Sequence, residues 1–193
     1  KLANDHGLSS LVYNNLEKQG CSGFVPEKYR YILRKSRLLS MARNAAMMHQ
    51  LEEVAAITGV KTVLLKGAAL ELMIYGNSGL RQMNDVDVLM TREDSVKSFR
   101  LLEQNGYRSL PVKSVFHRLI IDHIGKHLPS LIKGGLSIEL HHDLFDTVAS
   151  DLNRAFFEKS EKTSTGSVKV FLPEPCIFFL YLVRHIDKHE QLD

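Results

Sequence analysis

The chain has 193 residues, of which 44% are hydrophobic, and this is enough for one domain with a buried core. Its 25 basic and 22 acidic residues give a net charge of +3, which is too small to indicate nucleic-acid binding by itself. No apolar run approaches the roughly 18–20 residues that a membrane span needs, and this argues against a membrane protein.

The two cysteines, Cys21 and Cys176, lie far apart and belong to no CxxC pair. This pattern is typical of a reduced, cytoplasmic protein. The chain begins with Lys1 instead of methionine and ends without an obvious helix terminator. We therefore expect it to be a piece of a longer protein.

The first 60 residues predict an N-terminal helical segment. Residues 7–20 carry apolar side chains at helical spacing, and a longer helix is expected to follow Pro26 and to end at Gly59. One stripe of the longer helix is expected to face the core: Met41, Ala45, Met48, Leu51 and Ala55. Three arginines share another face, which is either solvated or in contact with phosphate: Arg30, Arg34 and Arg37.

Residues 61–148 are predicted to form the core of the fold. Apolar stretches bounded by turn residues indicate three strands: 61–65, 85–90 and 107–110. Helical patterns lie at 66–76, 91–106 and 114–125, the last with an ambiguous period. A hairpin is expected over 126–145, because Gly134–Gly135 can supply the two positive φ angles of a tight turn.

The remaining residues, 149–193, predict a C-terminal helical segment packed on this core. Helical patterns at 151–160 and 173–189 flank a strand candidate at 166–172. Together the three parts predict an α+β protein in one compact unit, with a small mixed β-sheet flanked by helices.

Two aspartates interrupt the apolar strand "DVDVLM". Because side chains alternate along a strand, Asp85 and Asp87 share a face and their Cα atoms lie about 6.6–6.8 Å apart. Two ionised carboxylates at this spacing repel, so the pKa of one should be raised unless a cation lies between them. A divalent metal bound by oxygen ligands, Mg²⁺ or Mn²⁺, would remove the conflict. The alternative is a half-exposed strand with two solvated aspartates.

A second alternating strand, "LSIELHH", carries a third carboxylate. Ser137, Glu139 and His141 point to one face of it. If this strand lies beside the strand of the two aspartates, the Glu139 carboxylate would complete a metal-binding triad with them. Upstream, "LLKGAAL" places Gly67 where a strand turns into a helix, which is where backbone N–H groups can receive phosphate. The GxxxxGK[ST] spacing of a Walker A loop is absent.

The order of these features resembles a known family. "LLKGAALELMIYGNSGLRQMNDVDVLM" together with "IELHHDLF" resembles a poorly characterised bacterial branch of nucleotidyltransferase-like proteins in the DNA polymerase beta superfamily, in which Lys-Gly, Gly-Leu-Arg, Asp-x-Asp and Glu-Leu-His recur in this order. The resemblance covers most of residues 5–190. It implies a nucleotidyltransferase fold with its core at 61–148, and transfer of a nucleoside monophosphate from an NTP to an unidentified acceptor.

The same resemblance implies roles for individual residues. By position, Asp85 and Asp87 would bind both metals, and Glu139 would bind the catalytic metal and help to deprotonate the acceptor. Gly67 would let the backbone approach the triphosphate. The sequence departs from many nucleotidyltransferases at Ala68, which supplies no hydroxyl for a phosphate. A catalytically inactive nucleotide- or partner-binding module with the same fold therefore remains the alternative.

Three further residues are expected to bind the nucleotide. Arg81 could contact phosphate oxygens in a bidentate way, or form a surface salt bridge. Lys66 could neutralise triphosphate charge, or lie at the exposed end of its strand. His141 shares the face of Glu139 and could orient it or contact phosphate, and a structural histidine with hydrogen-bonded nitrogens is the alternative.

The other histidines and the composition argue against two further classes of function. His185 and His189 are one helical turn apart, but Ile186 stands where the HExxH motif needs Glu, which argues against a zinc hydrolase. Helix packing or a surface position is expected for both, with a place in a cleft as the alternative. The mild charge and the lack of an aromatic–basic stacking platform argue against long nucleic acid as a partner.

Overall fold

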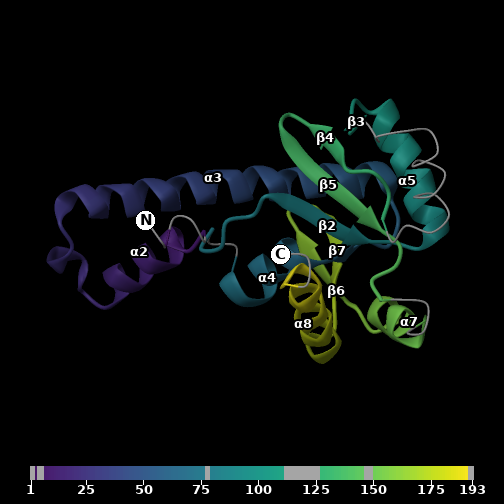
Figure 1. The fold of residues 1–193 in the computed structure, drawn as a ribbon. Coiled ribbons are helices and arrows are strands. Elements are labelled where there is room, and N and C mark those ends of the chain that lie inside the picture. The colour runs from purple at the N-terminus through teal and green to yellow at the C-terminus, as the bar shows by residue number, and fades with distance from the viewer. Residues whose placement is uncertain (1–2, 4–6, 77–78, 111–126, 146–149, 191–193) are drawn as a thin grey trace.

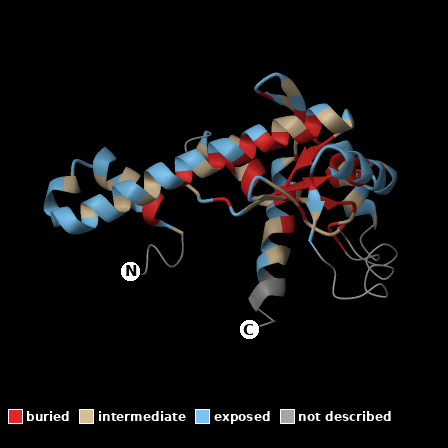
Figure 2. Cartoon of the chain, turned by 90° about the horizontal axis from the view of Figure 1, so that it is seen from above, coloured by how far each residue is buried: buried red, intermediate tan, exposed pale blue. Residues whose placement is uncertain are grey.

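The structure, a computed structural model, describes residues 3, 7–76, 79–110, 127–145 and 150–190. A mixed seven-stranded sheet forms the centre, with α3 on one side and α8 on the other (Figures 1 and 2). This arrangement confirms the predicted α+β class with a mixed sheet and flanking helices. No helix in the described ranges is long and apolar enough to cross a membrane.

The strand order is β3-β4-β5-β2-β1-β7-β6. Two pairs are parallel, β2 with β5 and β1 with β7, and the other neighbours are antiparallel. The strands are β1 (Val63–Leu64), β2 (Asp85–Leu89), β3 (Arg108–Ser109), β4 (Leu131–Lys133), β5 (Leu136–His141), β6 (Glu161–Thr165) and β7 (Val168–Leu172).

Apart from the short η1, which was not predicted, the described helices lie where the apolar periodicity predicts them. They are α2 (Ser9–Lys18), η1 (Ser22–Phe24), α3 (Glu27–Thr58), α4 (Lys66–Leu70), its π-helical continuation η2 (Glu71–Tyr75), α5 (Arg92–Gln104), α7 (Ser150–Glu158) and α8 (Pro175–Glu190). Local signals set their ends. Gly59 ends α3 in the left-handed conformation, and Thr91 caps α5 by accepting a hydrogen bond from the Asp94 backbone N–H.

The hairpin around Gly134–Gly135 is confirmed, since both glycines have positive φ and β4 pairs antiparallel with β5. The edge strand β6 was not predicted, because its polar sequence, "EKTST", lacks an apolar face. β6 and β7 extend the same sheet as β1, so residues 149–193 are not only helical. The helix expected at 114–125 lies outside the described residues, and the three-part division of the chain stays a prediction.

The predicted core stripe of α3 is partly wrong. Met48, Leu51 and Ala55 are buried, but Met41 and Ala45 are exposed. The buried face is rotated by about one residue and contains Ser40, Asn44, Met47, Met48, Gln50, Leu51, Val54 and Ala55. The reason is that the first half of α3 extends beyond the sheet together with α2, and only its second half covers the strands (Figure 2).

We call the projecting part of the chain, α2 and the first half of α3, the arm. The arginine face of the arm is not uniformly solvated. Arg34 is exposed, whereas Arg37 is half-buried and donates a hydrogen bond of 3.1 Å from its guanidinium to Asn14 Oδ1 of α2. Both cysteines are free.

Candidate active site

The pairing of β2 with β5 brings two of the predicted acids together. In this parallel pair Asp87 lies opposite Glu139, and Leu89 lies opposite His141. Since side chains alternate, Asp87, Glu139 and His141 share one face of the sheet. One ligand atom of each lies within 4.8 Å of the other two.

Asp87 is at the centre of this group. It is 1% exposed, and its Oδ1 accepts hydrogen bonds from Lys66 Nζ at 2.7 Å and from His141 Nε2 at 2.8 Å. Its other oxygen, Oδ2, is buried without a partner among the described residues. Burial would raise the pKa of Asp87, but the hydrogen bonds and charges of His141 and Lys66 outweigh it and lower the pKa.

Glu139 is held from both sides. Ser130 Oγ donates to its Oε1 at 2.7 Å, and His141 Nε2 lies 3.6 Å from its Oε2. The close contact with His141, helped by Ser130 and opposed by burial, lowers the pKa of Glu139 to about 2. Burial alone would lower the pKa of His141, yet its hydrogen bond to Asp87 and the nearby carboxylate of Glu139 raise it. The imidazole therefore favours the ionised form of both carboxylates.

Asp85, the third predicted metal ligand, is not a member of the group formed by Asp87, Glu139 and His141. It lines the same surface cleft as Glu139 and His141. It is only half-buried, at the start of β2. Burial and the charge of Asp87 both raise the pKa of Asp85. This agrees with the expectation that one of two aspartates on a strand face has a raised pKa.

The turn between β1 and α4 brings a lysine and an arginine to the carboxylates. Lys66, the first residue of α4, has a φ of 38°, the one positive value at a non-glycine position in the described ranges. A Cβ added at Gly67 would lie 2.7 Å from Arg81 Nη1 and 3.2 Å from Met83 Cγ. The missing side chain thus lets the guanidinium of Arg81 lie over the turn.

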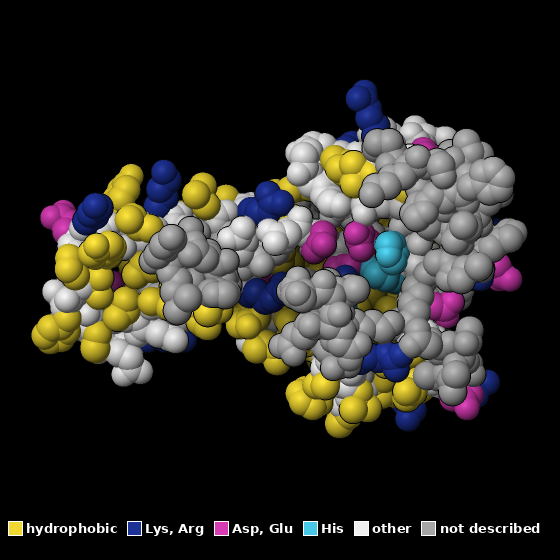
Figure 3. All heavy atoms as spheres, in the orientation of Figure 1, with side chains coloured by type: hydrophobic (Ala, Val, Ile, Leu, Met, Phe, Trp, Pro, Cys, Tyr) yellow, Lys and Arg dark blue, Asp and Glu magenta, His cyan; other side chains and the backbone are white. Residues whose placement is uncertain are grey.

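An open cleft of about 570 Å³ is lined by most of these residues. Asp87, which is 1% exposed, is not one of the lining residues. Acidic and histidine side chains gather at the centre of this face of the molecule (Figure 3). Six lining residues were predicted to be in the site: Lys66, Gly67, Arg81, Asp85, Glu139 and His141. The structure adds His127, Asp143, Leu144, Tyr181 and His185.

The added residues have a clear reason for being missed. His127 precedes β4, and Tyr181 and His185 belong to α8, so only the tertiary arrangement of these elements brings them to the cleft. His185 stacks on Tyr181, with ring centroids 6.0 Å apart. The cleft position that was the alternative for His185 is therefore observed, and the side chain of His189 lies outside the described part.

Two residues of α3 hold the segment that leads into β2. Asn44, 2% exposed, donates from Nδ2 to the Arg81 carbonyl at 2.7 Å and accepts the Met83 N–H at Oδ1 at 3.1 Å. Its neighbour Arg43 donates to the carbonyls of Met83 and Asn84 at 2.9 and 3.2 Å. In the sequence, the available signal for this role was a polar residue, Asn44, among the apolar residues of the buried face of α3.

We compared the chain with known protein families and structures. A family model described as an uncharacterised nucleotidyltransferase matches residues 1–193. This chain belongs to that family. The narrower bacterial branch and its motifs stay a prediction. No curated protein matches the chain.

One solved structure resembles this member of the nucleotidyltransferase family. It is the crystal structure of a candidate nucleotidyltransferase from Thermotoga maritima, with a TM-score of 0.46 and 15% sequence identity over 75% of this chain and 89% of that chain. This similarity is too low to transfer residue roles, which rest on the geometry described above.

Proposed function

We propose that this protein is a metal-dependent nucleotidyltransferase, which moves a nucleoside monophosphate from an NTP to an acceptor hydroxyl. The observation that carries the proposal is the convergence of Asp87, Glu139 and His141, which each have a polar atom within 4.8 Å of the other two. Glu139 and His141 also line the open cleft. A module that had lost catalysis could tolerate Glu139 pointing away from Asp87. The facing carboxylates support the enzyme instead.

The donor set fits a divalent cation. Asp87 and Glu139 supply carboxylate oxygens, the ligands that Mg²⁺ and Mn²⁺ prefer, while His141 donates from Nε2 to Asp87 and keeps these carboxylates ionised. The buried Asp87 Oδ2 has no partner among the described residues, although a buried carboxylate oxygen is costly to leave unsatisfied. A bound divalent cation would neutralise negative charge that develops on the phosphate during an in-line displacement.

The cations of the cleft would bind the triphosphate. Arg81 presents a planar guanidinium, which matches two phosphate oxygens at once. Lys66 compensates the charge of buried Asp87 and reaches the same cleft. Gly67, which has no side chain, leaves room for the Arg81 guanidinium over the turn, where it would meet a phosphate.

The pKa directions separate the roles of the carboxylates. A pKa of about 2 makes Glu139 a weak proton acceptor, so we assign it as a metal ligand and not as the base. Asp85, whose pKa is raised, is the better acceptor for the hydroxyl proton. In the proposed step the proton of the acceptor goes to Asp85, the hydroxyl oxygen bonds to the α-phosphorus, and pyrophosphate leaves.

Nucleotide binding tests the proposal first. Mn²⁺ or Mg²⁺ together with an NTP should raise the melting temperature, and Asp87→Asn should remove this shift while the protein stays folded by circular dichroism. Lys97→Gln, a change at an exposed position of α5, is the control. Absence of a shift with each of the four NTPs would contradict the proposal.

Transfer is tested separately. The protein, incubated with NTPs that carry ³²P at the α-phosphate, Mn²⁺ and a cell extract, should label an acceptor, and Asp87→Asn should not. Binding without any labelled product would favour the non-catalytic module. The chemical class of the labelled product would identify the acceptor.

A further inference from the structure

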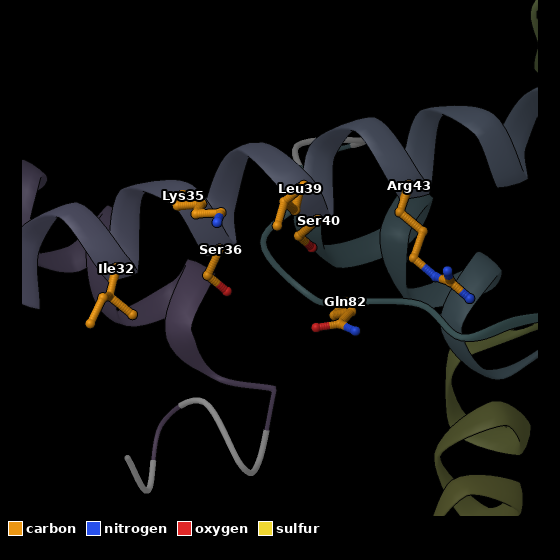
Figure 4. A pocket seen from close by; sticks show the side chains of 7 residues that line it. All are labelled: Ile32, Lys35, Ser36, Leu39, Ser40, Arg43 and Gln82. Carbon is orange, nitrogen blue, oxygen red and sulfur yellow. The ribbon is translucent and has the colours of Figure 1, made fainter.

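A second pocket lies on the arm, beside the cleft. It has a volume of about 470 Å³ and is lined by Ile32, Lys35, Ser36, Leu39, Ser40, Arg43 and Gln82. We call it the arm pocket. Figure 4 shows its side chains between α3 and the loop that carries Gln82.

The sequence builds the arm pocket from two neighbouring ridges of α3. Residues four apart lie along one ridge of a helix, and the two ridges here are Ile32–Ser36–Ser40 and Lys35–Leu39–Arg43. The facing loop is packed closely on the same helix, since a Cβ at Gly79 would lie 2.6 Å from Met41 Cα. Loop and helix therefore give the pocket a defined shape.

The arm pocket carries positive charge without a compensating acid. Lys35 and Arg43 line it, and no aspartate or glutamate does. Throughout the described ranges Lys35 forms no ion pair, and the hydrogen bonds of Arg43 go to the neutral carbonyls of Met83 and Asn84. The cleft, in contrast, contains Asp85, Glu139 and Asp143.

The polar groups of the arm pocket also suit a ligand. Ser40 is 3% exposed, and its Oγ has no hydrogen-bond partner among the residues described. A buried hydroxyl without a partner costs free energy that a polar ligand, or a water held by it, can offset. Ser36 and Gln82 add a hydroxyl and an amide, while Ile32 and Leu39 add apolar surface.

The arm pocket and the cleft share one loop. Gln82 of the pocket directly follows Arg81 of the cleft, and Asp85 is three residues further along. On the face shown in Figure 3, basic side chains over α3 lie next to the acidic and histidine group. A molecule seated in the arm pocket could therefore extend to the reacting centre.

We propose that the arm pocket binds an anionic group of the acceptor, a phosphate or carboxylate on a partly apolar body. This inference rests on the proposed nucleotidyl transfer and adds a substrate class to it. Arg43 lies eight residues after Lys35, about 12 Å along the helix axis, and this distance sets the length of acceptor that can contact both cations.

Equilibrium dialysis with ³²P-orthophosphate, ³²P-pyrophosphate and ¹⁴C-citrate tests anion binding. EDTA excludes metal-dependent binding in the cleft. Wild-type protein should retain at least one probe, and Lys35→Glu should weaken retention roughly tenfold or more. Ser36→Glu, which places a carboxylate between the two cations, should act in the same direction. Preference for phosphates or for citrate distinguishes the two anion classes.

The controls locate the anion. Lys28→Glu makes the same charge change on α3 outside the arm pocket, and Lys66→Ala removes a cation of the cleft. The amount of probe that each of these two variants retains should lie within about twofold of the amount that wild type retains. Failure of wild type to bind any probe would overturn the inference, as would equal losses in Lys28→Glu and Lys35→Glu or a loss confined to Lys66→Ala.

The acceptor assignment and the proposed function fail in different ways. Lys35→Glu should keep the melting shift with Mn²⁺ and NTP but reduce labelling of the acceptor roughly tenfold or more. Unchanged labelling would overturn the acceptor assignment and leave nucleotidyl transfer standing. A wild-type protein with neither an NTP shift nor a labelled product would contradict the transfer itself.

Discussion

Lys66 Nζ lies 2.7 Å from Asp87 Oδ1, so the side chain at the turn into α4 compensates the buried carboxylate of the candidate site. Lys66 adopts a positive φ of 38°, a conformation that is costly for a residue with a side chain. Strain of this kind persists where the surrounding contacts hold the residue in place. The contact explains why a lysine occupies the position.

Lys66→Met should destabilise the fold by about 1–3 kcal/mol, because it leaves buried Asp87 with His141 alone to compensate its charge. Urea denaturation measures the change. Lys97→Met, at an exposed site on α5, should change the free energy of unfolding by less than about 0.5 kcal/mol. Equal stabilities of the two variants would contradict the role assigned to Lys66.

Gly67→Ala should reduce nucleotide binding more than stability. The new Cβ would lie 2.7 Å from Arg81 Nη1, and the flexible guanidinium can move away at low cost. Displaced Arg81 would no longer be aligned for phosphate, so the melting shift with Mn²⁺ and NTP should fall by at least half. Gly23→Ala is the control, since its Cβ meets nothing within 4 Å. An unchanged shift in Gly67→Ala would show that the position of Arg81 does not matter.

Asn44→Leu should impair the site from a distance. It removes both hydrogen bonds to the loop of Arg81 and Met83 and should cost about 1–3 kcal/mol of folding free energy, measured in urea. Asn44→Asp keeps an acceptor for the Met83 N–H but sets a carboxylate oxygen against the Arg81 carbonyl. We expect both variants to weaken the NTP-dependent melting shift. Full retention of the shift would limit Asn44 to a structural role.

Acid should destabilise the protein through Glu139. Its pKa falls from the ordinary 4.5 to about 2, mainly through the contact with His141 Nε2 at 3.6 Å. A carboxyl whose pKa is lower in the folded state adds stability above pH 4.5, and this contribution is lost as the pH falls toward 2. Glu139→Gln should therefore flatten the decline of the melting temperature in this window. If the melting temperature of Glu139→Gln fell with pH as steeply as that of wild type, the low pKa assigned to Glu139 would be contradicted.

The contribution of His141 to stability depends on pH in the opposite direction. Because its pKa is raised, its contribution is fully present below its ordinary value of 6.5 and is lost as the pH rises through the raised value. His141→Gln should reduce stability most at mildly acidic pH and least in alkaline solution, as measured by melting temperature. A loss that is uniform with pH would show that the charge of the imidazole plays no part.

The sequence by itself determined the elements that depend on neighbouring residues. Gly59 ends α3, Thr91 begins α5, and the two glycines at 134–135 close a hairpin, since each signal acts within a few residues. The alternation of β2 placed Asp85 and Asp87 on one face in the same local way. The edge strand β6 was missed because its polar residues gain their pairing only from β7.

Only the tertiary structure decided which groups meet. The parallel register of β2 and β5 sets Asp87 beside Glu139 and lets His141 reach both carboxylates. No short-range signal fixes that register, because it follows from burying the opposite faces of both strands in the shared core. The buried face of α3 and the contacts of Asn44 likewise depend on where the sheet ends, which the helix sequence does not encode.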